Sequence, residues 1–150
     1  MAEATEAAQL AEALIGRYAL EAEMYHELLL VAREQGGLLR RDEDVGRYAA
    51  LFPRKDELLR SIGLIERELE PFKLRWWAVD VGAESRARLD GLLDGILGAI
   101  DAIREQESLN EQCLLSRGAA ARRGLRKAPV AAAVAPPPAP LPASLMASAV

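Results

Sequence analysis

The stretch YAALFPRKDELLRSIGLIERELEPFKLRWWAV, residues 48–79, decides the fold. Within it, a row of mostly apolar residues is spaced alternately three and four residues apart. The row consists of Tyr48, Leu51, Lys55, Leu58, Ile62, Ile65, Leu69, Phe72, Trp76 and Val79. On a helix this spacing puts side chains on one face, as in helices that pack lengthwise against one another. We call this row the 48–79 seam. A long helical surface of this kind favours binding of another polypeptide over catalysis.

A second helix is predicted upstream, from about residue 5 to 40. One stripe contains Leu14, Tyr18, Glu21, Tyr25, Leu28, Ala32, Gln35 and Leu39, and an adjacent stripe contains Leu10, Ala13, Leu20, Met24, Val31 and Leu38. Two adjacent stripes make a face wide enough to touch two other helices. Gly36-Gly37 would suit a helix C-terminus. Because the stripe resumes at Leu39, we instead expect a helix that is loosened there and continues to Arg40.

The helix that carries the 48–79 seam is predicted from about residue 43 to 81. Asp42 suits its N-cap, with two further acids in the first turn. Pro53 disfavours helical geometry at Phe52, so a break or kink is expected there, and Pro71 should bend the helix again. The seam keeps its phase past both prolines, and this predicts one bent helix.

A third helix is predicted from about residue 84 to 120, after a turn at residues 80–85. Its inward row is Leu89, Leu93, Ile96, Ile100, Ile103, Glu107, Asn110, Leu114 and Arg117, apolar at first and then polar. Gly91, Gly95 and Gly98 each cost roughly 1 kcal/mol relative to alanine inside a helix. We expect close approach to a neighbouring helix to compensate, with a strained or mobile segment as the alternative.

Composition completes the predicted architecture. Residues 124–150 are rich in Pro and Ala, and the run of prolines between 136 and 142 blocks both helix and sheet. The chain is therefore expected to be all-α: an elongated antiparallel three-helix bundle or coiled coil over residues 1–120, followed by a disordered tail.

Charge and targeting signals restrict the partners and the location. The chain has a net charge of −4, but residues 1–116 hold 14 bases and all 23 acids. An acidic body argues against nucleic acid as a partner. A lone cysteine, Cys113, fits a reducing compartment. With no signal-peptide pattern and no apolar run of membrane-spanning length, we expect a cytoplasmic protein that does not insert into membranes.

No constellation of residues favours chemistry. Glu23 and His26 have the spacing found in di-iron bundles, but His26 is the sole histidine and a second such motif is impossible within one chain. We expect His26 to be a surface histidine, and a metal site shared by two copies of the chain is the alternative. Neither a nucleophile with its base nor a phosphate loop is present. We therefore expect neither an enzyme nor a bound cofactor or metal.

Two positions on the 48–79 seam stand out. Lys55 is expected either to keep its charge in water while its stem covers apolar surface, or to pair with a carboxylate of another helix and set the register. Trp76 is in phase with the seam and is predicted to be core. Trp77 points about 100° away, so it should cover a neighbouring helix or anchor a partner.

Three stretches together resemble the flagellar export chaperones of the FlgN kind. They are ELLLVARE through LRRD (residues 27–42), RKDELL with the following Ile62, Ile65 and Glu66, and QESLNEQCLL (residues 106–115). The likeness spans roughly residues 8–118. Pro53, Pro71 and the glycines near residue 95 depart from that family's pattern, as does the length of the tail.

The resemblance implies a cytoplasmic chaperone. Such proteins bind the helical ends of hook-associated (hook–filament junction) proteins and deliver them to components of the flagellar type III export apparatus. We expect a monomer or weak homodimer whose partner surface is formed by Leu109, Asn110, Cys113, Leu114, Leu115 and Trp77. The alternative is a structural coiled-coil adaptor that associates with itself.

Overall fold

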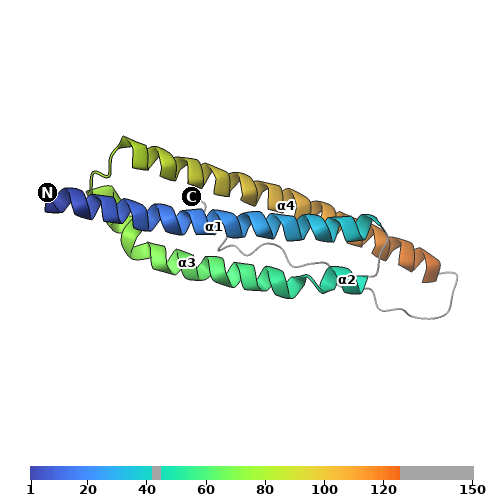
Figure 1. Ribbon diagram of the computed structural model, residues 1–150. Coiled ribbons are helices and arrows are strands. Elements are labelled where there is room, and N and C mark those ends of the chain that lie inside the picture. The colour runs from blue at the N-terminus through green and yellow to red at the C-terminus, as the bar shows by residue number, and fades with distance from the viewer. Residues whose placement is uncertain (42–44, 126–150) are drawn as a thin grey trace.

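The computed structural model describes residues 1–41 and 45–125, and all of its regular structure there is helical. The helices are α1 (Ala2–Arg40), α2 (Val45–Ala49), α3 (Phe52–Ala78) and α4 (Ala83–Leu125). Figure 1 shows an elongated bundle in which α1 runs between α4 on one side and α2 with α3 on the other. The predicted all-α, three-helix architecture is confirmed. The predicted tail lies outside the described residues, apart from 124 and 125, which continue α4.

The seam prediction for residues 48–79 is confirmed at every position. Seven of its ten residues are buried, and Leu51, Phe72 and Val79 are half-buried. The break expected at Pro53 is confirmed, because the chain turns at Ala50–Leu51. The turn separates two helices, α2 and α3, so the predicted single bent helix is wrong. Pro53 then stands in the first turn of α3, where a missing N–H costs nothing. Pro71 lies inside α3, which continues past it. The predicted cap at Asp42 lies outside the described residues.

The turn between α3 and α4 follows from its sequence. The carboxylate of Asp80 accepts a hydrogen bond from the backbone N–H of Gly82 at 3.1 Å. Gly82 has a φ of +87°, a conformation that side-chain-bearing residues rarely adopt. An aspartate two residues before such a glycine closes a tight turn. This turn makes α3 and α4 antiparallel.

A buried polar layer joins all four helices. The ammonium group of Lys55 donates to Glu107 on α4 and to Gln35 on α1, the latter at 3.2 Å. The Gln35 amide in turn donates to the Tyr48 carbonyl of α2 at 3.1 Å. On the α4 side, the Asn110 amide donates to the Ala32 carbonyl of α1 at 3.0 Å. The prediction that Lys55 pairs with a carboxylate of another helix is therefore confirmed.

Helix α1 is the central element of the bundle. Its backbone comes close to α2, α3 and α4, whereas α3 and α4 come close to each other almost nowhere along the described chain. Long side chains bridge that wider gap, as Lys55 does to Glu107 and as Arg86 does by lying 5.3 Å from the centre of the Trp76 ring. Both predicted stripes of α1 are used, although Leu20 is exposed.

The expectation for the glycines of α4 is wrong. A Cβ added at Gly91, Gly95 or Gly98 would meet nothing within 4 Å, because all three lie on the exposed side of α4. The close approach occurs instead at Gly36 of α1, where an added Cβ would meet the Gln106 amide and would lie 2.7 Å from the Asn110 carbonyl oxygen. α1 does continue through Gly36-Gly37 to Arg40, as predicted.

We predict opposite effects for the two neighbouring glycines of α1. Gly37→Ala should stabilise the protein by about 0.5–1 kcal/mol, because a Cβ there meets nothing within 4 Å and alanine favours the helix. Gly36→Ala should destabilise it by roughly 1–3 kcal/mol, because the added methyl displaces Asn110 and Gln106. Urea unfolding of both variants measures the difference. Equal effects would show that α4 does not approach α1 at Gly36.

The polar layer should be strongly coupled. Lys55→Met leaves the buried Glu107 carboxylate without its cation and should cost about 3–5 kcal/mol. Adding Glu107→Leu should recover much of that loss, since the pair is then replaced by apolar side chains. Arg54→Ala is the matched control: its ion pair with Glu27 is half-exposed, so it should cost under about 1 kcal/mol. Additive losses in the double variant would contradict the coupling.

Candidate functional site

The side of the bundle where α3 faces α4 is the candidate binding surface. We call it the open face and mark it by Leu59 and Gly63 on α3 and by Leu93 and Leu97 on α4. Leu59 and Gly63 are one helical turn apart, as are Leu93 and Leu97, so each pair shares a face of its helix. The contacts Lys55–Glu107 and Trp76–Arg86 fix an antiparallel register that places Leu97 about level with Ile65.

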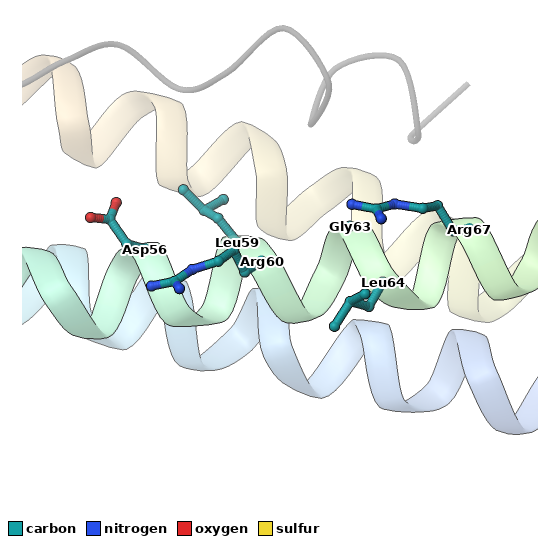
Figure 2. Close-up of a pocket in the computed structure, with 6 residues that line it drawn as sticks. All are labelled: Asp56, Leu59, Arg60, Gly63, Leu64 and Arg67. Carbon is teal, nitrogen blue, oxygen red and sulfur yellow. The ribbon is translucent and has the colours of Figure 1, made fainter.

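Helix α3 carries an open hollow on this side. Its lining in the described chain is Asp56, Leu59, Arg60, Gly63, Leu64 and Arg67. Figure 2 shows Leu59 and Leu64 pointing to different sides of α3. Leu59 packs partly against the core, while Leu64 is exposed. Because Gly63 has no side chain between them, the helix surface is low at this point and leaves room for a side chain from outside.

A cavity of about 190 Å³ lies between α1, α3 and α4 near the α3–α4 turn. Buried residues form its inner part, among them Leu14, Tyr18, Trp76 and Leu89. Trp77, Asp90 and Leu93 form the rest, together with Lys73. Trp76 is buried as predicted, but Trp77 is 81% exposed. Of the two expectations for Trp77, covering a neighbouring helix is therefore wrong, and a partner anchor stays a prediction.

The predicted partner surface near the end of α4 does not form one continuous face. Asn110 is buried and its amide is bonded to the Ala32 carbonyl, so it offers nothing to a partner in this conformation. Cys113 and Leu114 are half-buried. Leu109 and Leu115 are exposed, but six residues separate them, which places them about 120° apart around a helix of 3.6 residues per turn. Binding through these residues stays a prediction.

Exposed apolar side chains occur on all three long helices. The larger ones are Leu20, Leu30, Leu64, Leu74, Trp77, Leu97, Leu109 and Leu115. Leu97, at 39% exposed, lies on the open face one helical turn from the half-buried Leu93. Single exposed leucines are common in soluble proteins, whereas neighbouring ones beside a gap between helices suggest a contact surface.

The buried carboxyl group of Glu21 meets the half-buried carboxyl group of Glu66 where α1 packs on α3. Glu21 is 1% exposed, and neither of its oxygens has a donor among the described residues. Its carboxyl lies against that of Glu66, whose other oxygen accepts a 2.7 Å hydrogen bond from Lys73. Two ionised carboxylates cannot bond to each other, so this contact needs a proton. Burial, and then the Glu66 carboxyl, raise the pKa of Glu21 to about 9, and Lys73 lowers it only in part.

A buried hydroxyl also lies in the polar layer. The Tyr48 hydroxyl has no hydrogen-bond partner among the described residues. Burial, and then the nearby charges of Glu107 and Glu111, raise the pKa of Tyr48 above its ordinary value. The phenol therefore stays neutral, and no described group is placed to take its proton.

The residues considered for metal binding or catalysis do not converge. Glu23 and His26 are both exposed on α1. Within the described ranges, 1–41 and 45–125, no group of three or more His, Cys, Asp or Glu residues could hold a metal ion. None of the described helices is long and apolar enough to cross a membrane. What this arrangement offers to other molecules is apolar helical surface.

The Glu21 pair predicts a specific dependence of stability on pH. The folded protein keeps the Glu21 proton up to about pH 9, while the unfolded chain loses it near its ordinary value of 4.5. Unfolding therefore releases a proton between these values. The stabilisation is complete below pH 4.5 and is lost as pH rises towards 9, by up to about 1.4 kcal/mol per pH unit.

Glu21→Gln tests this directly. The glutamine amide donates to Glu66 without a titrating proton, so stability should fall less between pH 6 and 9 than in the parent protein. Glu23→Gln, two residues away and exposed, is the control and should leave the slope unchanged. Urea unfolding at several pH values measures the slopes. Tyr18 and Lys73 are the other titrating groups at this position, and both keep their ordinary charge below pH 9. Parallel profiles for parent and Glu21→Gln would contradict the shared proton.

Comparison of the chain with protein-family models, with curated proteins and with solved structures found no match. The family resemblance rests on the three stretches of sequence described above.

Proposed function

We propose that the protein binds an amphipathic helix of another polypeptide, as a cytoplasmic export chaperone for the helical ends of hook–filament junction proteins. One observation carries the proposal: the backbones of α3 and α4 both come close to α1 but almost nowhere to each other, so the bundle is widest on the side between α3 and α4. A fourth helix laid between α3 and α4 would complete a four-helix arrangement. Its apolar stripe would cover Leu59, Leu93 and Leu97.

The open face suits binding that must also be released. Leu59 and Leu93 are already partly packed against the core, although Leu97 is exposed, so the free protein is not destabilised by a fully exposed apolar groove. The surface that a partner would newly bury is therefore modest. Helix-in-groove recognition gains most of its free energy from such apolar burial. Delivery to the export apparatus is supported by the resemblance alone.

We predict saturable binding of C-terminal helical segments from the hook–filament junction proteins of the same organism. Isothermal titration calorimetry should show one segment per chain and a negative heat-capacity change, the marker of apolar burial. No heat from folded protein would contradict the chaperone proposal and favour the self-associating adaptor.

Three charge substitutions locate the surface. Leu97→Asp should weaken binding at least about tenfold, because it places a carboxylate on the open face. Leu30→Asp is the matched control: Leu30 is exposed on α1, and its replacement should leave affinity unchanged. Leu115→Asp tests the surface predicted from sequence at the end of α4. Loss of binding in Leu115→Asp, with Leu97→Asp unaffected, would move the site there.

A further inference from the structure

The end of the bundle at the α3–α4 turn carries a projecting aromatic ring next to a cavity that one ring would fill. The chain has seven aromatic residues, all among the described ones, and Trp77 alone is exposed. It stands at the edge of the 190 Å³ cavity between α1, α3 and α4. Apolar cavities of roughly 150 Å³ bind benzene, so this cavity has room for one aromatic ring.

We propose that this end of the bundle is a self-association surface on which two copies of the chain exchange Trp77. Each indole would enter the cavity of the other copy. In a two-fold interface the same patch serves on both sides, so each copy must present both the projecting group and the cavity that receives it. Both lie here on one patch, since Trp77 itself lines the cavity.

The charges beside the cavity fit a second copy. Arg86 and Asp90 lie one helical turn apart at the start of α4, with Arg86 over the Trp76 ring and Asp90 in the cavity wall. Lys73 also lines the cavity, but its ammonium group is bonded to Glu66. A patch that presents both a base and an acid, here Arg86 and Asp90, is complementary to itself when a two-fold axis passes between them. In such a pair, Arg86 of one copy would face the acid of the other. A partner of one charge sign has no such advantage.

The exposed side chains at this end of the bundle also favour self-association. Leu74 and Trp77 are 77% and 81% exposed and one turn apart on α3, which makes this turn of the helix unusually apolar for a surface. Exposed tryptophans at a contact tend to be the residues that carry its affinity. With only this end of the bundle in contact, the dimer should be weak. The surface shares Leu93 with the open face but otherwise uses different residues, and its argument does not depend on the proposed function.

Sedimentation equilibrium of the full chain, from micromolar to near-millimolar concentration, tests the proposal. We expect a reversible monomer–dimer equilibrium that Trp77→Ala weakens by about tenfold or more. Leu93→Phe, which narrows the cavity but keeps Trp77, should weaken it as well. Leu115→Ala is the control, because Leu115 is an exposed leucine near the other end of α4 and should leave the equilibrium unchanged.

Fluorescence gives an independent readout. The exposed indole of Trp77 should emit at long wavelength in dilute solution and shift to the blue as dimers form, while the buried Trp76 should change little. A chain that stays monomeric throughout, or a Trp77→Ala variant that dimerises like the parent, would overturn the proposal. The proposal would also be overturned if the chain were monomeric and Trp77→Ala abolished binding of a junction-protein segment. That result would show that the cavity receives a side chain of another protein.

Discussion

The buried Lys55–Glu107 pair is the constraint on which the arrangement of the helices depends. A buried cation needs a carboxylate and further acceptors, and Glu107 and Gln35 supply them from α4 and α1. Only one register of the three long helices brings these groups together. The apolar seams alone would tolerate slippage by a turn, because leucine and isoleucine recur all along them. The polar layer removes that freedom.

The same layer explains why one side of the bundle stays open. Lysine and glutamate are long, so a pair that joins α3 to α4 holds the two helices further apart than packed leucines would. α1 meets α4 differently: Gly36 and Ala32 are small, and Asn110 reaches the α1 backbone directly. The bundle is therefore tight between α1 and α4 and wide between α3 and α4. The open face is a consequence of which side chains were placed at each contact.

The sequence predicts most of this fold because the spacing of apolar residues indicates which face of each helix points into the bundle. Every residue of the 48–79 seam is buried or half-buried, and the pairing of Lys55 is one of the two outcomes that its place on that seam predicts. The inward row of α4 also contains Asn110, and its burial follows from that spacing. The predicted close approach at the glycines of α4 is wrong. A glycine has no side chain that would indicate which way it faces, and whether it lies at a close contact depends on where the neighbouring helix runs. The open face could not be predicted, since it arises from distances between helices.

The two proposed surfaces meet at Leu93 and otherwise use different parts of one elongated body. Pairing through Trp77 would join two copies at the ends formed by the α3–α4 turns, where α1 also begins (Figure 1). Leu59 and Leu97 lie further along the bundle, so each copy would keep its own open face. A weak dimer of this kind would present two helix-binding faces and could hold two segments at once. Binding of paired segments would then be stronger than binding of single ones, since the second contact is made within one complex.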